Sequence, residues 1–167
     1  MNFNELIQTR YSVRAYRPEP VEPEKLSAVL EAFRLAPTAA NRQPFRLYVI
    51  DTAKHREALK RLYHREWFTQ APLVLGVVAV AEEGWTRRDG KNYADVDATI
   101  AFDHLILQAA DLGLGTCWIA AFDPAVAREL LDLPPNWEPV CFTPLGYPAD
   151  EPRAKIRKPL EDLVIYW

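Results

Sequence analysis

Residues Asp95 to Leu112 read DVDATIAFDHLILQAADL, and this stretch decides most of the fold. Its spacing predicts a helix, because the polar residues fall mostly on one stripe while apolar side chains cover the rest of the surface. One face of a sheet would cover a narrower apolar arc than this one. We therefore expect the helix to be buried in the centre of the domain or at a subunit interface.

Shorter elements alternate on both sides of this central helix. Helices are expected from Glu5 to about Arg10, from Pro23 to about Leu35, from Lys54 to about Tyr63 and from Pro124 to about Leu131. Strands are expected at 47–50, 73–80, 116–121 and 140–147. The apolar run at 73–80 is typical of a strand that is buried on both faces.

Polar residues at the expected helix starts serve as caps. Asn4 can cap the first helix and Asp123 the last one. Asp95 and Asp97 lie at the start of the central helix, where the positive end of the helix dipole stabilises negative charge. We expect first-turn capping to explain both carboxylates, and Gly113 to stop the helix at its other end.

The tail, residues 148–167, is a charged arm with several prolines that ends in the β-type segment Leu163–Trp167. An apolar strand after such an arm has to pair somewhere, and pairing with a second chain is one solution. The sequence contains no internal repeat and no linker rich in Gly or Ser. We therefore expect residues 1–167 to form a single domain.

Composition indicates an ordinary soluble protein. The chain has 167 residues, 49% of them hydrophobic, and a formal net charge of −3, which disfavours a nucleic-acid partner. Its longest apolar run, Ala71 to Ala81, is far shorter than the roughly 20 residues of a membrane span. The first residues lack the pattern of a secretory signal, so a cytoplasmic location is expected. The two cysteines, Cys117 and Cys141, are expected to be buried as small apolar residues.

The segment Arg10-Tyr-Ser-Val-Arg14 outlines an anion site. In an extended chain Arg10, Ser12 and Arg14 share one side, and in a helix the two arginines, four residues apart, share a face. Two guanidinium groups with a hydroxyl between them match the oxygens of a phosphate monoester. The same pattern also fits a solvated charged face, and the spacing alone leaves both interpretations open.

The loop Pro37-Thr-Ala-Ala-Asn-Arg-Gln43 consists of small residues and two carboxamides between prolines. Asn41 and Gln43 each carry a donor and an acceptor, so they can pair with the imide edge of a flat ring such as the pyrimidine end of a flavin. Small residues let such a ring approach the backbone. An ordinary loop at the end of a helix would look similar.

Other kinds of site find little support in the sequence. His55, His64 and His104 have no second ligand at metal spacing, so no metal site is expected. Gly113-Leu-Gly115 lacks the third glycine of a Rossmann-type dinucleotide loop and closes a helix where that loop would open one. No P-loop and no serine nucleophile motif is present.

Four motifs occur in the order found in the nitroreductase family, which the chain resembles over nearly its whole length. They are Arg10-Tyr-Ser-Val-Arg14, the loop 36–44, the turn 109–118 and the closing segment Arg157-Lys-Pro-Leu-Glu161. The resemblance implies an α+β fold, with a three-layer α-β-α domain around a central mixed sheet. It also implies an intertwined homodimer, in which the C-terminal strand is exchanged onto the partner's sheet.

The resemblance further implies FMN as cofactor, bound at the dimer interface. On the phosphate and ribityl side the cofactor-binding residues would be Arg10, Tyr11, Ser12, Arg14, Lys155 and Arg157. Along the ring they would be Pro37, Thr38, Ala39, Asn41 and Gln43, contributed by the other subunit. A backbone N–H near Ala120 would donate to the flavin N5, so no side chain is expected to be catalytic.

The chemistry that the resemblance implies is a ping-pong oxidoreductase reaction. NAD(P)H is the expected co-substrate, and a nitroaromatic or a quinone-like molecule is the expected small-molecule electron acceptor. Two alternatives remain: a flavin-binding or storage module that turns over no acceptor, and a specialised relative that fragments the flavin or dehalogenates a substrate.

Overall fold

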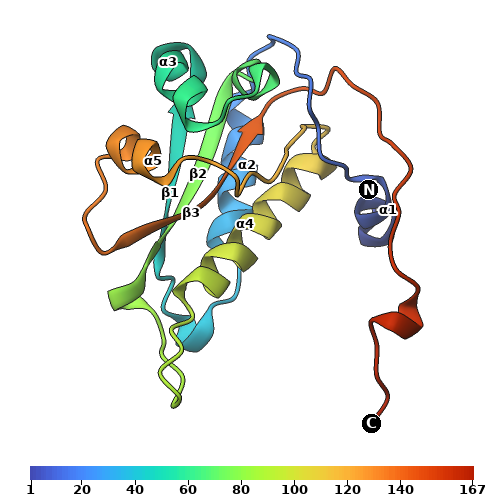
Figure 1. The fold of residues 1–167 in the computed structure, drawn as a ribbon. Coiled ribbons are helices and arrows are strands. Elements are labelled where there is room, and N and C mark those ends of the chain that lie inside the picture. The colour runs from blue at the N-terminus through green and yellow to red at the C-terminus, as the bar shows by residue number, and fades with distance from the viewer.

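Three strands form the central layer of the structure, a computed structural model that describes residues 1–167 (Figure 1). They are β1 (Phe45–Asp51), β2 (Leu73–Val80) and β3 (Trp137–Leu145), paired in the order β1-β2-β3. Both pairs are antiparallel. The predicted strands at 47–50 and 73–80 are confirmed, and the one at 140–147 lies slightly earlier than predicted.

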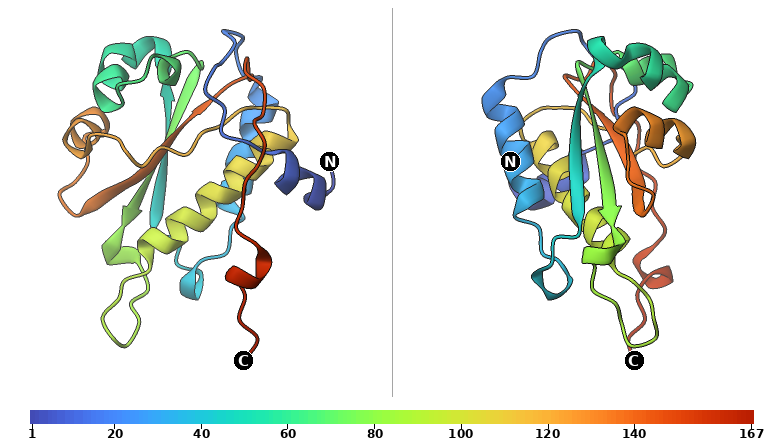
Figure 2. Two further views of the ribbon diagram at one scale, coloured as in Figure 1. Left: turned by 45° about the vertical axis from the view of Figure 1, so that its right-hand side comes forward. Right: turned by 90° about the vertical axis from the view of Figure 1, so that its left-hand side faces the viewer.

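Helices cover both faces of this sheet, which confirms the three-layer α+β fold (Figure 2). On one side lie α2 (Pro23–Arg34) and α4 (Ala94–Asp111), and on the other α3 (Thr52–Leu62) and α5 (Pro124–Leu131). The first helix, α1 (Phe3–Thr9), lies apart from the sheet and contacts α4.

The central strand β2 connects the two cores. Leu75, Val77 and Ala79 belong to the cluster with α2 and α4, whereas Val74 and Val78 belong to the cluster with α3 and α5. The alternation follows from the two-residue period of a strand. Because both faces are covered, the strand carries an unbroken apolar sequence.

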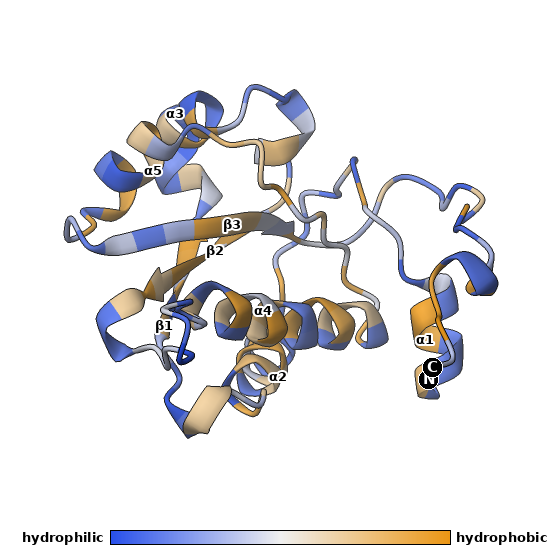
Figure 3. Cartoon of the chain, turned by 60° about the horizontal axis from the view of Figure 1, so that its bottom comes forward, coloured by the Kyte–Doolittle hydropathy of each residue, from blue (hydrophilic) through white to orange (hydrophobic).

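The wide apolar arc of α4 is explained by its position between α2 and the sheet. Phe102 and Leu105 are fully buried, and small alanines such as Ala98 and Ala101 let the neighbouring elements come close. Figure 3 shows that α4 and β2 are mostly apolar, whereas the turn that joins them is polar. The prediction of a helix in the centre of the domain is confirmed.

Two predicted caps are wrong. Asn2, not Asn4, caps α1, and it forms a capping box with Glu5 that fixes the start of the helix two residues earlier. At the start of α4, Asn92 Oδ1 accepts a hydrogen bond from Ala94 N–H at 2.9 Å. Asp97 does not cap this turn; it is buried and bonds to a different segment of the chain.

The predicted strand at 116–121 is not a regular strand. It makes isolated bridges instead, antiparallel between Ile119 and Phe142 of β3 and parallel between Thr116 and Ser12. Each bridge involves a single residue of this segment, so no continuous ladder of strand hydrogen bonds forms. The Thr116–Ser12 bridge is also the one parallel pairing, so the expected mixed sheet exists only at this point.

The C-terminal arm makes no strand within the chain. A short 3-10 turn covers Leu160–Asp162, and the predicted β-type segment Leu163–Trp167 has no pairing partner. Figure 1 shows the arm leaving the sheet layers and passing beside α1. Its apolar side chains are exposed, with Ile165 at 87% and Tyr166 at 92%.

Both cysteines are buried and unpaired, as predicted. Among the helices, none combines the length and the apolar character that crossing a bilayer requires.

Gly115 lets the Arg10–Arg14 segment lie against the rest of the protein. A Cβ atom at this position would come within 2.7 Å of the side chain of Val13. Val13 is buried, and its N–H donates to the carbonyl of Thr116 at 2.9 Å. The close contact therefore favours glycine, because any Cβ at position 115 would force the buried side chain of Val13 to shift.

We expect Gly115→Ala to displace Val13 and to destabilise the protein by about 1–3 kcal/mol, the usual range for overpacking a filled site. Urea unfolding measures this change. Equal stability of Gly115→Ala and the wild type would contradict the close-contact account.

Candidate functional site

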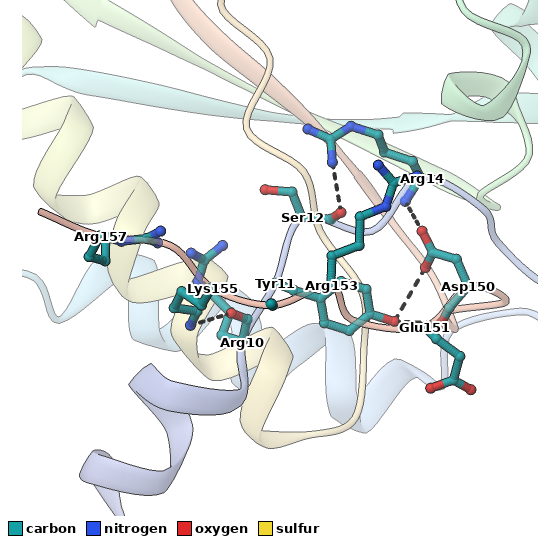
Figure 4. A pocket seen from close by; sticks show the side chains of 10 residues that line it. Arg10, Tyr11, Ser12, Arg14, Asp150, Glu151, Arg153, Lys155 and Arg157 are labelled. Atoms are coloured by element: carbon teal, nitrogen blue, oxygen red, sulfur yellow. Dashed lines mark hydrogen bonds between the residues drawn. The ribbon is translucent and has the colours of Figure 1, made fainter.

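A cavity of about 410 Å³ lies between the Arg10–Arg14 segment and the start of the C-terminal arm (Figure 4). Ten residues line it: Arg10, Tyr11, Ser12, Arg14, Asp150, Glu151, Arg153, Ala154, Lys155 and Arg157. Six of the residues predicted on the phosphate side are therefore brought together, although two segments some 140 positions apart supply them. We call this cavity the cationic cavity.

The local backbone explains how the first segment presents its side chains. Helix α1 ends at Thr9, and Arg10 already has an extended conformation with φ −54° and ψ 132°. The chain then runs alongside Thr116, to which Val13 is hydrogen bonded. Because side chains alternate in an extended chain, Val13 points into the core while Ser12 and Arg14 line the cavity.

Positive charge dominates the cationic cavity. Five cationic side chains line it against two carboxylates, and none of the five forms an ion pair within 4.0 Å. Arg14 instead donates to the carbonyl of Ser12 at 3.2 Å, and Arg157 to that of Ile156 at 2.7 Å. The charges are thus uncompensated within the chain, which is what an anionic ligand requires.

Asp150 ties the arm to the Arg10–Arg14 segment. Its Oδ2 accepts from the backbone N–H of Arg14 at 2.7 Å, and its carbonyl accepts from the hydroxyl of Tyr11 at 2.7 Å. Burial of the phenol, together with the charge of Asp150, raises the pKa of Tyr11 to about 12. Tyr11 therefore stays a neutral donor at physiological pH.

Lys155 bridges the arm and the end of α1. Its Nζ donates to the carbonyl of Ile7 at 2.7 Å and to that of Arg10 at 2.8 Å, so it satisfies carbonyl groups at the helix C-terminus. Burial lowers the pKa of Lys155, and the positive charges of Arg10 and Arg157 lower it further. Two of the three causes of this shift are thus cations that line the same cavity.

Sequence reasoning missed four lining residues, Asp150, Glu151, Arg153 and Ala154. A signal for Arg153 was available, because positions 153, 155 and 157 alternate in an extended arm just as 10, 12 and 14 do. No such signal pointed to Asp150, whose role depends on where the arm crosses the N-terminal segment.

The predicted ring-side loop, residues 37–43, forms a strained turn. Ala40, Asn41 and Gln43 have φ values of 51°, 53° and 48°, in the left-handed region that residues other than glycine seldom adopt. Gln43 Nε2 donates to Asn41 Oδ1 at 2.7 Å, and the backbone N–H of Gln43 donates to Thr38 Oγ1 at 3.2 Å. The two carboxamides are thereby held in one orientation on the surface.

The loop lies at one end of α4, and the Arg10–Arg14 segment, which lines the cationic cavity, lies at the other (Figure 1). Ala39 is bonded to Asp97 in the first turn of the helix, whereas Arg10 lies beside Ala110 in its last turn. At about 1.5 Å per residue, these two points are about 20 Å apart along the helix axis. Within one chain, Pro37, Thr38, Ala39, Asn41 and Gln43 therefore do not join the residues of the cationic cavity.

Ala120 lies four positions beyond Thr116 in the segment that follows the Ser12–Thr116 bridge. Ile119, just before it, exchanges two backbone hydrogen bonds with Phe142. Ala120 itself is exposed, and its N–H donates to no acceptor in the chain. The free donor is about 13 Å along an extended backbone from the Ser12–Thr116 bridge.

Comparison with known proteins shows the family and agrees with the fold. A sequence profile of the nitroreductase family matches residues 7–68 and 52–147. A solved structure of a nitroreductase family protein from Clostridium difficile 630 has a TM-score of 0.92 and 41% identity, covering 99% of this chain and 98% of that one.

Two curated relatives also match over most of the chain. An NADH dehydrogenase of Thermus thermophilus is 29% identical, with 94% of this chain and 92% of the relative covered. The FMN reductase (NAD(P)H) of Bacillus subtilis is 30% identical, over 95% of this chain and 72% of the relative. From the profile match and these similarities, the chain belongs to the nitroreductase family of oxidoreductases.

Proposed function

We propose that the protein is an FMN-dependent NAD(P)H oxidoreductase that works by a ping-pong reaction and reduces nitroaromatic or quinone-like acceptors. Its family and its similarity to an FMN reductase support the cofactor and the co-substrate. The cationic cavity is the observation that carries the proposal, because its uncompensated charges are suited to a phosphate monoester.

The residues of the cationic cavity fit the phosphate end of FMN. Arg10 and Arg14 offer guanidinium forks, and the hydroxyl of Ser12 lies between them. Lys155 has two of its three donors occupied by carbonyl groups, which leaves one for an anion. Each charge-assisted bond of this kind contributes roughly 1.5–3 kcal/mol when desolvated.

The ring-side loop would reach the same cofactor from a second chain. Its separation from the cationic cavity by the length of α4 supports this, since one small cofactor has to meet both. The exposed apolar arm gives a reason for dimerisation, because Ile165, Tyr166 and Trp167 find no cover within their own chain. A partner subunit that takes up this segment would bury it.

When bound, FMN supplies the hydride and electron transfer between NAD(P)H and the acceptor. The chain binds and orients the cofactor: the cationic cavity holds the phosphate, and Asn41 and Gln43 offer donors and acceptors to the ring edge. The free N–H of Ala120 is available to a ring nitrogen that gains electron density on reduction. No side chain is assigned a proton-transfer role.

Arg10→Ala and Arg14→Ala should each weaken FMN binding by about 2 kcal/mol, since each removes a charge-assisted contact to the phosphate. Fluorescence titration of the apoprotein with FMN measures this loss. Arg61→Ala is the control, because Arg61 forms an exposed ion pair with Glu129 and does not line the cavity. Unchanged affinity in both cavity variants would overturn the phosphate assignment.

The same preparation tests turnover. Protein loaded with FMN should lose its visible flavin absorbance when NADPH is added without oxygen, and a quinone should restore it. A flavin that stays oxidised in the presence of NADPH and NADH would identify a flavin-binding module instead of an enzyme.

Affinity for FMN should fall at alkaline pH because of Lys155. The pKa of its ammonium is already lowered from 10.5, and a bound phosphate favours the charged form. Affinity is therefore full below this lowered pKa and is lost as the pH rises through it. Lys155→Arg stays charged and should lack this loss. Titrations from about pH 7 to about pH 10 compare the two, and identical profiles would contradict the role of Lys155.

A further inference from the structure

Asp97 is the only charged side chain that is buried in this protein, with 2% of its surface exposed. Its Oδ1 accepts a hydrogen bond from the backbone N–H of Ala39 at 2.8 Å, and its Oδ2 is buried without a partner. No lysine or arginine forms an ion pair with it. An unpaired buried carboxylate is unfavourable, so stability alone does not account for Asp97.

The position of Asp97 in α4 reduces the free-energy cost of burying its carboxylate. It lies in the first turn, where its own N–H bonds to the carbonyl of Tyr93 and the helix dipole favours negative charge. The carboxylate is thus fixed to the most buried helix of the fold. It holds Ala39, the residue directly before the left-handed part of the strained turn.

The rest of the turn has few other attachments to the core. Arg42 donates to the carbonyl of Gly84 at 2.8 Å, and Pro44 accepts from Val80 N–H at the far end of the loop. The bonds from Gln43 to Thr38 and Asn41 lie within the loop itself. Asp97 is therefore the attachment that fixes the start of the turn to the interior.

The strain makes this attachment necessary. Ala40 and Asn41 follow Ala39 directly, and both have left-handed backbone conformations. Ala40 has no polar side chain that could stabilise this conformation locally, unlike Asn41. A loop without the bond from Asp97 would relax to more extended conformations, and the carboxamides of Asn41 and Gln43 would lose their common orientation.

We propose that Asp97 is a positioning residue for the flavin ring: through Ala39 it holds the turn in the conformation in which Asn41 and Gln43 meet the cofactor. The proposal rests on the proposed function, because it assumes that this loop contacts the ring. Asp97 itself touches no cofactor. Its effect is to order the binding surface before the cofactor arrives, which lowers the entropy lost on binding.

Hydrogen exchange in the apoprotein tests the attachment without any cofactor. Asp97→Ala should speed exchange of the Ala39 amide by about tenfold or more, since a hydrogen bond to a charged group is lost. Asp95→Ala is the matched control, because Asp95 lies in the same helical turn but is exposed. An Ala39 amide that exchanges equally slowly in both variants would overturn the proposal.

FMN titration tests the consequence for the cofactor. Asp97→Ala should also weaken FMN binding by about tenfold or more, whereas Asp95→Ala should bind as the wild type does. Asp97→Asn keeps an oxygen acceptor for Ala39 N–H and should recover part of both effects. If Asp97→Ala does not fold, Asp97→Asn compared with Asp95→Asn carries the same test, with faster Ala39 exchange and weaker FMN binding expected.

Arg10→Ala separates this proposal from the proposed function. It should weaken FMN binding without changing exchange at Ala39, whereas Asp97→Ala changes both. If Arg10→Ala weakens FMN binding and Asp97→Ala does not, the positioning role is wrong and the phosphate site stands. If the wild type binds no FMN, both fail, and a protected Ala39 amide then marks Asp97 as purely structural.

Discussion

The burial of α4 on two sides is the constraint on which the rest of the structure depends. α2 covers one side of this helix and the sheet covers the other, so its 18 residues are held in place along the whole core. The two groups of residues that suit a flavin are attached to its two ends. In the proposed function, one chain therefore presents two half-sites that face different surroundings, and a complete site would need a second chain.

The charges of the cationic cavity and the exposed apolar side chains of the arm support the same two-chain arrangement. The cationic cavity keeps its charges uncompensated, and the arm that supplies three of them ends in exposed apolar residues. Asp150 holds the first part of this arm against the Arg10–Arg14 segment, and Lys155 holds it against the end of α1. The last part of the arm has no such bonds within the chain. In the proposed function, the arm would thus contribute to cofactor binding at one end and would be available for dimerisation at the other.

Much of the fold could be predicted from sequence, because local signals agreed with the tertiary structure. The apolar run of β2 and the Asp-Pro start of α5 are examples, since burial and capping act within a few residues. The segments 116–121 and Leu163–Trp167 were predicted as strands for their composition, but pairing depends on distant partners that composition does not reveal. Family resemblance, more than spacing, identified FMN.

The site residues also divide into those that local sequence patterns predict and those that only the tertiary structure reveals. The two-residue period of an extended chain predicts that Arg10, Ser12 and Arg14 share a side. The role of Asp97 was not predictable, because an aspartate in a first turn looks the same whether it caps the helix or reaches across to another segment. Only the tertiary structure distinguishes a local hydrogen bond from one that joins positions 58 residues apart.

A complementation experiment tests the two-chain site most directly. One chain carries Arg10→Ala with Arg14→Ala, the other Asn41→Ala with Gln43→Ala, and different affinity tags isolate the heterodimer. With a site shared between chains, one of its two sites is intact and the other carries all four changes, so about half of the wild-type FMN content is predicted. If both half-sites belonged to one chain, every site would be defective. A heterodimer without FMN, from a wild type that binds it, would contradict the shared site.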